Sequence, residues 1–523
     1  MAKNESMHWA DQIARKVVKE KGSRSSYVVA AGITPSGTVH IGNFREMITV
    51  DLVNRALKAL GKKVRFIYSW DDYDVFRKIP KNMPDPEVLK KYLRKPIVDT
   101  PDTFKCHKSY AEHNEKEVED VLPSVGIKPE FLYQSKKYRS CDYKEEIRFV
   151  LNNKEKARLI LDKFRKEPLP EQWYPLSVYC ERCNTDETKV TGYDNRYTVS
   201  YTCNCGFEGK ADFSKKGIVK LPWRLDWCMR WHHEKVDFEP GGKEHSTVGG
   251  SYSTAKLLVK ELYDIDAPVY QKYDFIILKG IGGKMSSSAG NVITLKDALD
   301  VYEPGIIRYL FASTRPDAEF SISFDLDVLK VYEDFDRCER VYYKKEKVEN
   351  KEFLKQKRIY ELSCIEKPSK SMPFQASFRH LCNTVQIYED DLSKIRESYG
   401  IKGKQDIERL KIRAGCASNW LSRYAPEEMR FHVQKEVKIR LEGREKEAIG
   451  KLVDYLKKHA QLDEKLLYEE FYNIAKASGL ETKEFFKVCY RILINKERGP
   501  RLAPFILTLG RERVVKLLES IKP

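Results

Sequence analysis

A histidine lies in a glycine-bracketed loop near the N-terminus, in the stretch "GITPSGTVHIGNF" from Gly32 to Phe44. The apolar run "YVVAAG" leads into this loop, and apolar residues at helical spacing follow it. A strand, a glycine loop and a helix start form a phosphate site, because the helix N-terminus offers unpaired N–H groups and a partial positive charge. His40 could donate hydrogen bonds to a phosphate there, while Gly37 and Gly42 allow close backbone approach. The alternative is an ordinary turn with a surface histidine.

A second stretch, "LKGIGGKMSSSAGNVI" from Leu278 to Ile293, carries related chemistry. Lys279 and Lys284 lie among glycines and serines, so cations and hydroxyls share one loop. Such a loop is suited to stabilising charge on a pyrophosphate leaving group. The alternative is a flexible polar loop, but two such segments in one chain favour a common nucleotide site.

Four cysteines form two short-spaced thiol pairs in a β-rich stretch, which favours a structural, tetrahedral zinc site. The alternative is four reduced cysteines that bind nothing. These thiols are Cys180, Cys183, Cys203 and Cys205.

The stretch "DTPDTFKCHKSYAEH" offers carboxylate, thiol and imidazole donors. His107 and His113 are too far apart for one turn of a straight helix, but a loop leading into a helix could still bring all the donors together. The alternative is a set of polar loop residues beside the active site. The candidate metal ligands here are Asp102, Cys106, His107 and His113.

The elements that must position these residues are strands alternating with helices. The N-terminal pattern predicts a unit of two parallel strands joined by a helix. In chain order it consists of a helix from Trp9, a strand, the histidine loop, a helix closing at Gly61 and the strand "KVRFIYSWDD". Prolines and the cysteines mark an insertion, after which the α/β pattern resumes. We predict an α/β, Rossmann-like parallel-sheet catalytic domain with a zinc-bearing insertion, followed by an all-α C-terminal domain. The predicted ranges are 1–80 and 226–330 for the two catalytic halves, 81–225 for the insertion and 331–523 for the helical domain.

The composition is that of a charged globular protein. The chain has 523 residues, 41% hydrophobic and 33% charged, with a net charge of +17. It contains no apolar run long enough for a membrane helix and no secretory h-region, and eight of its 12 cysteines are scattered singly. A cytoplasmic protein with reduced thiols is therefore expected. The positive charge indicates either a lysine-rich solvated surface or a nucleic-acid partner, and part of the excess lies beyond residue 330.

Two motifs together resemble a known family. "HIGN", His40 to Asn43, resembles the His-Ile-Gly-His motif of class I aminoacyl-tRNA synthetases, and "KMSSS", Lys284 to Ser288, resembles their KMSKS motif. More specifically, the chain is similar to the class I lysyl-tRNA synthetases. The stretches that carry this similarity span almost the full length: "HWAD", "GITPSGTVHIGNFRE", "WDDYDVFRK", "CHKSYAEH", "WRLDWCMRW", "DFEPGGKEH", "GKMSSSAGNV" and "KERGPRLAPF".

The chain departs from the family motifs at two positions. Asn43 replaces the last histidine of the first motif, so this side chain can hydrogen-bond but cannot carry a proton. Ser287 replaces the second lysine of the second motif, which leaves Lys284 as the main charge. Lys279 could compensate for the missing cation.

The resemblance implies activation of an amino acid by ATP with Mg²⁺, followed by transfer to the 2′-hydroxyl of tRNA. Catalysis is then positioning and stabilisation of phosphate charge, without a side-chain nucleophile. The implied catalytic residues are His40, Asn43 and Lys284. The implied ATP-binding residues are Ser36, Gly37, His40, Gly42, Asn43, Lys284, Met285, Ser286, Ser287 and Ser288. The implied lysine-binding residues are Gly32, Thr34, Asp71, Trp223, His245 and Tyr273.

Lysine is implied as the amino acid because the glutamyl and glutaminyl relatives have an arginine where this chain has Gly32. A neutral residue removes the repulsion of a lysine ammonium, and a second such arginine falls near Gly241. The resemblance places Asp71 on the α-amino group, and Asp72 and Asp74 are further acidic candidates. Five residues remain candidates for the ε-ammonium contact: Trp223, Trp227, Glu239, His245 and Tyr273.

The resemblance also supports a metal at the second donor group, so that one or two structural zinc ions are expected. It implies tRNA(Lys) as partner, with the helical region receiving the anticodon; Arg498 and Arg501 flank a Gly-Pro turn there. We expect tRNA to be needed for full activation. The oligomeric state is left open, with a monomer as one option. The alternatives are a glutamyl- or glutaminyl-type synthetase, a small-molecule nucleotidylyltransferase and a catalytically silent RNA-binding relative.

Overall fold

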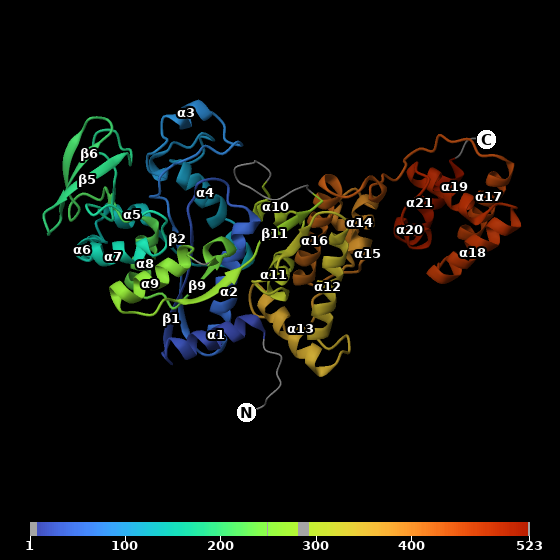
Figure 1. Ribbon diagram of the computed structural model, residues 1–523. Coiled ribbons are helices and arrows are strands. Elements are labelled where there is room, and N and C mark those ends of the chain that lie inside the picture. Colours follow the sequence, from blue (N-terminus) through green and yellow to red (C-terminus); the bar gives the residue numbers. More distant parts are fainter. Residues whose placement is uncertain (1–7, 248, 281–291, 521–523) are drawn as a thin grey trace.

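The computed structural model describes residues 8–247, 249–280 and 292–520. Its central element is a five-stranded sheet in the order β10-β9-β1-β2-β3, in which every neighbouring pair is parallel (Figure 1). The order reverses between β1 and β9, which opens a crevice at the carboxyl ends of these strands. The strands are β1 (Ser26–Ile33), β2 (Lys63–Trp70), β3 (Glu130–Tyr133), β9 (Phe238–Gly242) and β10 (Val269–Tyr273).

Both faces of this sheet are covered, as its apolar strands require. Along β1, Val29 and Ala31 enter one hydrophobic core while Ala30 enters the other, because successive side chains of a strand point to opposite faces. Helices α1 (Trp9–Glu20), α2 (Ile41–Ala59) and α11 (Pro304–Ser313) contribute to the first core, and α8 (Trp223–Glu234) and α9 (Ser251–Tyr263) contribute to the second.

The region between β2 and α8 holds short helices and a small antiparallel sheet, β5-β6-β7, where the thiol pairs are. It also contributes β3 to the edge of the parallel sheet, although the sequence pattern assigns this region wholly to an insertion. The helices are α3 (Pro86–Lys90), α4 (Tyr110–Glu119), α5 (Gln134–Arg139), α6 (Lys144–Asn152) and α7 (Lys154–Asp162), with 3-10 turns at Ile97–Asp99 and Leu122–Val125. The strands are β4 (Ser177–Val178), β5 (Thr188–Tyr193), β6 (Thr198–Cys203), β7 (Glu208–Asp212) and β8 (Val219–Lys220).

A separate parallel pair, β11 (Ile276–Lys279) and β12 (Phe320–Ser323), follows the main sheet, and α10 (Leu295–Leu299) lies between them in the chain. A 3-10 turn, Lys243–Ser246, follows β9. The second signature motif falls between β11 and α10. Residues Lys284 to Ser288 lie outside the described part of the chain.

The C-terminal helices form two groups. The first group shares the core of the sheet, whereas the second has a core of its own and forms the lobe at one end of the molecule (Figure 1). The first group is α12 (Asp327–Tyr342), α13 (Asn350–Ser363), α14 (Phe378–Ile387), α15 (Leu392–Ser398) and α16 (Lys404–Arg423), followed by a 3-10 turn at Glu427–Met429. The terminal lobe is α17 (Gly443–Lys458), α18 (Glu464–Ala477), α19 (Thr482–Ile494), α20 (Leu502–Leu509) and α21 (Arg511–Glu519).

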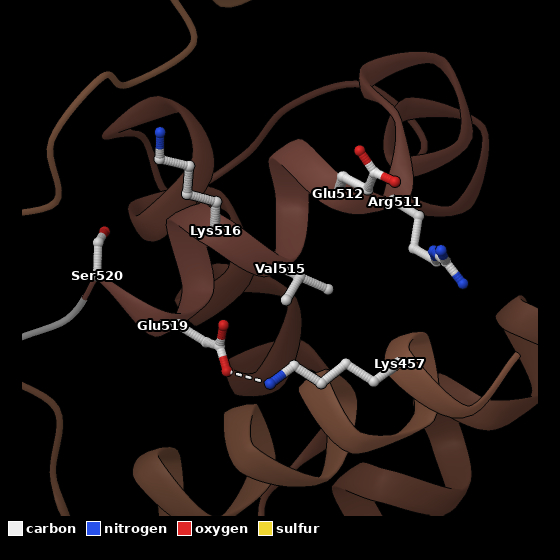
Figure 2. Close-up of a pocket in the computed structure, with 7 residues that line it drawn as sticks. All are labelled: Lys457, Arg511, Glu512, Val515, Lys516, Glu519 and Ser520. Carbon is white, nitrogen blue, oxygen red and sulfur yellow. Dashed lines mark hydrogen bonds and ion pairs between the residues drawn. The ribbon is translucent and has the colours of Figure 1, made fainter. Parts of the chain in front are cut away.

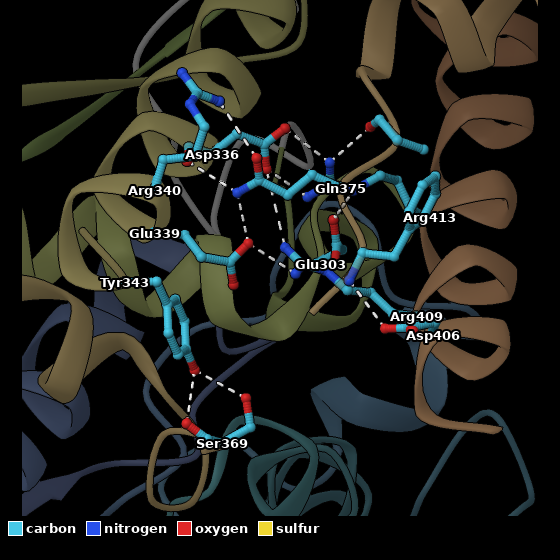
Figure 3. Close-up of polar contacts among 12 residues, drawn as sticks. Glu303, Asp336, Glu339, Arg340, Tyr343, Ser369, Gln375, Asp406, Arg409 and Arg413 are labelled. Carbon is cyan, nitrogen blue, oxygen red and sulfur yellow. Dashed lines mark hydrogen bonds and ion pairs between the residues drawn. The ribbon is translucent and has the colours of Figure 1, made fainter. Parts of the chain in front are cut away.

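A buried ionic network joins the first helical group to α11, which packs on the parallel sheet (Figure 3). Arg413 of α16 donates to both carboxylate oxygens of Asp336 in α12, at 2.8 and 2.9 Å, and also pairs with Glu303 at the start of α11. Arg409 donates to Glu339 at 2.8 Å. Burial raises the pKa of Asp336 and the arginines oppose this rise. Removing one partner would leave buried charge uncompensated, so the network fixes the relative positions of the three helices.

The terminal lobe is closed by contacts between its first and last helices (Figure 2). Lys457 of α17 pairs with Glu519 of α21 at 2.5 Å, and Arg511 donates to the backbone carbonyl of His459 at 3.3 Å. Among the helices that the structure describes, none combines the length and the apolar character needed to cross a membrane.

Candidate active site

A cleft of about 670 Å³ opens at the carboxyl ends of β1 and β2, where the strand order predicts a ligand site. Most of the described residues that the sequence singles out for nucleotide or lysine binding line it. These residues are Gly32, Thr34, Ser36, Gly37, Asn43, Asp71, Trp223, His245 and Tyr273. Arg77 and Lys78 also line the cleft and are exposed, so that they add positive charge to it.

His40 is the N-cap of α2, as the loop pattern predicts. Its Nδ1 atom accepts the N–H of Gly42 at 3.1 Å, and burial lowers the pKa of the imidazole. The ring is therefore neutral at pH 7 and carries its proton on Nε2, which makes Nε2 a donor. His40 does not line the large cleft but an adjoining pocket of about 300 Å³, and the two pockets share Val39.

Asn43 stabilises the start of α2. Its Oδ1 atom accepts the backbone N–H of His40 at 3.1 Å, so the two side chains form a reciprocal capping box. The departure from the family histidine therefore has a structural use at this position. Sequence reasoning assigned Asn43 to catalysis and missed this contact.

The described residues after the second motif are held against the first motif. The backbone N–H of Ile41 donates to the carbonyl of Ile293 at 2.7 Å, and His40 and Thr294 form an antiparallel bridge. On the other flank, the ammonium of Lys279 lies 3.4 Å from Asp327. The segment that carries Lys284 therefore ends beside the helix start that bears His40, whereas Lys279 is directed to a carboxylate and does not line the cleft.

Glu46 of α2 lines the cleft, and sequence reasoning missed it. Its carboxylate accepts the hydroxyl of Tyr273 at 2.7 Å and the backbone N–H of Gly32 at 3.0 Å. Burial raises the pKa of Glu46 to about 8, and the negative charges of Glu239 and Asp71 add to this rise. Both hydrogen-bond partners are neutral, so a cationic ligand in the cleft would stabilise the ionised form of this carboxyl group.

The aspartates that follow β2 have different surroundings. Asp71 lines the cleft, but its carboxylate already accepts the Arg230 guanidinium at 2.7 Å. Asp74 pairs with Lys220 and accepts the hydroxyl of Thr34 at 2.8 Å. Asp72 lies outside the cleft lining and accepts the backbone N–H of Ser135 at 2.7 Å; burial raises its pKa to about 6. Of the three aspartates, only Asp71 and Asp74 can contact a ligand in the cleft.

Of the five candidates for the ε-ammonium contact, some line the cleft and others lie behind its wall. Trp223, at the start of α8, lines the cleft and stacks on Trp227 with ring centroids 5.1 Å apart. The indole N–H of Trp227 donates to Glu239 at 3.0 Å, and Trp231 donates to the other oxygen of the same carboxylate at 2.5 Å. Glu239 and Trp227 therefore support the wall, whereas Trp223, His245 and Tyr273 face the cavity.

Gly32 and Gly241, the two glycines that the resemblance singles out, leave little room for a side chain. A Cβ atom on Gly32 would lie 2.9 Å from both the Cβ and the carbonyl oxygen of Ser69 in the neighbouring strand. A Cβ atom on Gly241 would lie 2.2 Å from the hydroxyl of Tyr270. A substitution at Gly32 therefore tests strand packing as well as charge.

The four thiols of the first metal group come together in the β5-β6-β7 region. Their sulfur atoms lie within 4.8 Å of one another, with Cys183–Cys203 at 3.6 Å and Cys180–Cys205 at 3.8 Å. Thiolates at the corners of a tetrahedral zinc site are separated by about 3.8 Å, so the donor set fits this metal.

The second metal group also converges, on the loop that precedes α4. The sulfur of Cys106 lies 3.1 Å from His107 Nδ1 and 3.2 Å from His113 Nδ1, and Asp102 completes the group. The backbone N–H groups of Cys106 and His107 donate to the Asp102 carboxylate, which holds the loop in a tight turn. A loop leading into a helix, as the sequence allowed, thus brings the four donors together.

Helix α4 connects this donor group to the histidine loop. The hydroxyl of Tyr110 donates to the carbonyl of Ser36 at 3.0 Å, and the side-chain amide of Asn114 lies 3.4 Å from the carbonyl of Pro35. A change at the start of α4 would therefore move the loop that lines the cleft.

Comparison with known proteins agrees with this geometry. A family model described as tRNA synthetases class I (K) matches residues 7–366, and the chain belongs to this family. Three relatives that align with almost the whole chain share one name. A lysine–tRNA ligase of Borreliella burgdorferi is 50% identical, and one of Treponema pallidum is 46% identical; each alignment covers 98% of both chains. A lysine–tRNA ligase of Pyrococcus horikoshii is 41% identical over 98% of this chain and 99% of its own.

Proposed function

We propose that this chain is an ATP-dependent ligase that activates L-lysine as lysyl-adenylate and transfers it to tRNA(Lys). The names of its full-length relatives support this activity. The observation that carries it is the carboxylate of Glu46, which lines the cleft and has only neutral hydrogen-bond partners. A charge-assisted contact with a ligand ammonium would stabilise this group.

Glu46 is the residue that we assign to the ε-ammonium of lysine. Tyr273 and Gly32 hold its carboxylate in place, and the exposed ring of Trp223 offers a second, cation–π contact. Asp71 would bind the α-amino group by exchanging part of its contact with Arg230. Thr34 and His245 complete the wall. A glutamate side chain would meet the Glu244 carboxylate in the same cleft and could not stabilise the ionised form of Glu46, which disfavours the glutamyl-type alternative.

The nucleotide would bind where the first motif begins α2. Ser36 and Gly37 line the cleft there, Gly42 leaves the backbone open, and the neutral imidazole of His40 offers its Nε2 proton to a phosphate oxygen. Lys284 and the motif residues Met285 to Ser288 would approach from the segment that ends at Ile293. Mg²⁺ bound with ATP would supply positive charge at the phosphates. The lysine carboxylate attacks the α-phosphorus, pyrophosphate leaves, and the tRNA 2′-hydroxyl then displaces AMP.

Two structural zinc ions fit the donor sets of the metal groups. The four cysteines would hold one, which would cross-link the turns of the β5-β6-β7 sheet. Asp102, Cys106, His107 and His113 would hold the other, which would steady α4 and, through Tyr110, the loop at Ser36. A thiol-ligated metal requires reduced cysteines, so we place the enzyme in the cytoplasm.

The helical C-terminal region would bind the anticodon. We keep the ranges 1–80, 81–225, 226–330 and 331–523 as our division of the chain, with β3 of the insertion extending the sheet and the first helical group sharing the core of the sheet. We propose a monomer, which sedimentation of the purified protein would test.

ATP–pyrophosphate exchange with each of the twenty amino acids, with and without tRNA(Lys), tests the function. We expect exchange with lysine alone, strong dependence on tRNA and subsequent charging. Exchange with glutamate or glutamine would place the chain in the neighbouring branch, and activity without any transfer to tRNA would indicate a nucleotidylyltransferase. Exchange with lysine that is equally fast without tRNA would remove only the proposed tRNA dependence.

A further inference from the structure

Arg230, in the second half of α8, carries a charge that is buried behind the wall of the active-site cleft. Its side chain does not line the cleft, whereas the carboxylate of its partner Asp71 does. A buried charge is costly unless it is both paired and hydrogen-bonded. The contacts of this guanidinium therefore determine which atoms beside the cleft are fixed and which can still accept a ligand.

The guanidinium of Arg230 contacts four groups at once. Its Nη1 atom donates to Asp71 Oδ1 at 2.7 Å and to the hydroxyl of Ser69 at 2.7 Å. Its Nε atom lies 3.2 Å from a carboxylate oxygen of Asp226, one turn earlier in α8. The ring of Trp223 covers the planar group, with the ring centroid 5.3 Å from Cζ. A lysine ammonium, which is a single point of charge, could not keep all these contacts together.

The two carboxylate oxygens of Asp71 have different surroundings. Oδ1 accepts the Arg230 guanidinium and also the hydroxyl of Ser69, at 3.0 Å. Oδ2 has one contact within the described residues, a long one of 3.4 Å to Nη2 of Arg230. A carboxylate oxygen can accept two hydrogen bonds. Oδ1 is therefore anchored, and Oδ2 has capacity left for a donor in the cleft.

The anchor of Asp71 is itself held from behind. Ser69, at the end of β2, accepts the side-chain amide of Gln134 at 2.8 Å, and Gln134 accepts the hydroxyl of Tyr143 at 3.0 Å. These side chains are buried. A contact group is held precisely when buried hydrogen bonds fix its supporting side chains. The orientation of the Asp71 carboxylate is thus set before a ligand arrives.

The chemistry of the remaining oxygen selects a cationic donor. The neighbouring carboxylates have partners of their own, since Asp226 accepts the hydroxyl of Tyr138 and Asp74 pairs with Lys220. Oδ2 of Asp71 is the oxygen in this group that gains most from a new donor. An ammonium fits it better than a hydroxyl or an amide, because charge-assisted hydrogen bonds are the stronger ones.

We propose that Arg230 is a positioning residue for recognition of the substrate α-ammonium, an inference that rests on the proposed activation of lysine. Together with Ser69 it fixes one oxygen of Asp71, so that the other oxygen accepts the α-ammonium. The contact that the ligand displaces is the 3.4 Å one. Arg230 touches no ligand atom. Through Asp71 it makes the cleft select α-amino acids over ligands that lack the α-amino group.

Calorimetric titration of the full chain with two ligands tests this role. L-lysine has the α-ammonium, whereas ε-aminocaproate keeps the carboxylate and the ε-ammonium but lacks that group. The wild type should bind lysine about 10- to 100-fold more tightly, the effect of one charge-assisted hydrogen bond. In Arg230→Lys this ratio should fall below about threefold while the affinity for ε-aminocaproate stays unchanged, because a point charge cannot hold the carboxylate in place.

The matched control is Arg224→Lys on the same helix, which should keep the full ratio, because Arg224 makes no hydrogen bond or ion pair within the described residues. Ser69→Ala should lower the ratio by a smaller factor, and it replaces Arg230→Lys if that variant does not fold. Asp71→Asn should abolish the ratio, and adding Arg230→Lys to it should cause no further change, since the two residues act as one unit.

Three results would overturn the positioning role. They are an unchanged ratio in both Arg230→Lys and Ser69→Ala, equal weakening of both ligands, as a merely structural residue would give, and equal affinity of the wild type for the two ligands. If the wild type activates another amino acid, the proposed function fails, but the same comparison of that amino acid with its deaminated analogue still tests Arg230. The two failures are therefore distinguishable.

Discussion

The backbone N–H of Ile41 donates a 2.7 Å hydrogen bond to the carbonyl of Ile293. This bond joins the first turn of the helix that carries His40 to the segment that follows the KMSSS motif. Segments far apart in the chain therefore meet at one helix N-terminus, where a polyphosphate is electrostatically favoured.

Glu46→Gln should weaken lysine binding while leaving the fold intact, because the amide keeps its size but loses the charge. The expected loss is about 10- to 100-fold, which corresponds to a charge-assisted hydrogen bond of roughly 1.5–3 kcal/mol. Quenching of Trp223 fluorescence by lysine would measure it. Glu130→Gln on the exposed edge strand is the control. Unchanged affinity in Glu46→Gln would remove Glu46 from the lysine site.

Lysine affinity should also rise with pH and then level off near pH 8. Glu46 in the free cleft has its pKa raised to about 8 by burial, so at lower pH a proton must leave before the ammonium can pair with the carboxylate. The dissociation constant should fall as pH rises from 6.5, with a slope that approaches tenfold per unit well below the pKa. Glu46→Gln should show no such slope. A flat profile in the wild type would contradict the assignment.

The variant His40→Asn distinguishes the role of Nδ1 from the role of Nε2. Asparagine can still accept the Gly42 N–H and cap α2, but it lacks a donor at the Nε2 position. We expect the rate of lysyl-adenylate formation to fall about 100- to 1000-fold, as when one transition-state donor is removed. Thermal stability and lysine affinity should change little. If stability falls in parallel with the rate, His40 acts only as a helix cap.

Cys203→Ser should remove about one zinc ion per chain, since a serine hydroxyl is a poor replacement for a thiolate ligand. Metal analysis of the purified variant measures this change directly. Protease sensitivity should increase within the β5-β6-β7 sheet. Cys141→Ser, at a cysteine outside both metal groups, should retain the full metal content.

Arg413→Met should destabilise the protein by about 3–5 kcal/mol, because the buried Glu303 and Asp336 would keep only their longer ion pairs with Arg409, at 3.6 and 3.9 Å. Denaturant unfolding measures the loss. Arg423→Gln removes an exposed ion pair with Asp300 and should leave the unfolding midpoint near that of the wild type. Comparable midpoints for both variants would mean that the buried network adds little to stability.

Local sequence signals were sufficient for the elements around His40. A buried strand, a glycine loop and a helix have distinct periodicities, and the thiol spacing led to four sulfurs that do converge. Glu46 could not be predicted in this way, because a single acid within a helix gives no sign of which neighbours it faces. The carboxylate acquires its role only when Tyr273, distant in sequence, donates to it.

Longer-range features were also beyond the sequence pattern. Strand β3 has only four residues, too few for a clear alternation, yet it extends the parallel sheet. Helical spacing beyond residue 330 predicted helices but not their partners. Trp420 of α16 packs into the core of the sheet, whereas Phe431, a short distance further on, packs into that of the terminal lobe. Amphipathic spacing shows which face of a helix is buried, but only the tertiary contacts show which core that face packs into.

Trp420 is also linked to the end of β11 by hydrogen bonds. Its indole N–H donates to the carbonyl of Phe324 at 2.9 Å. The backbone N–H of Phe324 in turn donates to the carbonyl of Lys279 at 2.9 Å. Lys279 is the last residue of β11, next to the segment with the second motif. A displacement of α16 would thus reach Lys279 through two hydrogen bonds, so that RNA bound to the helical region could change the position from which the segment with the second motif begins.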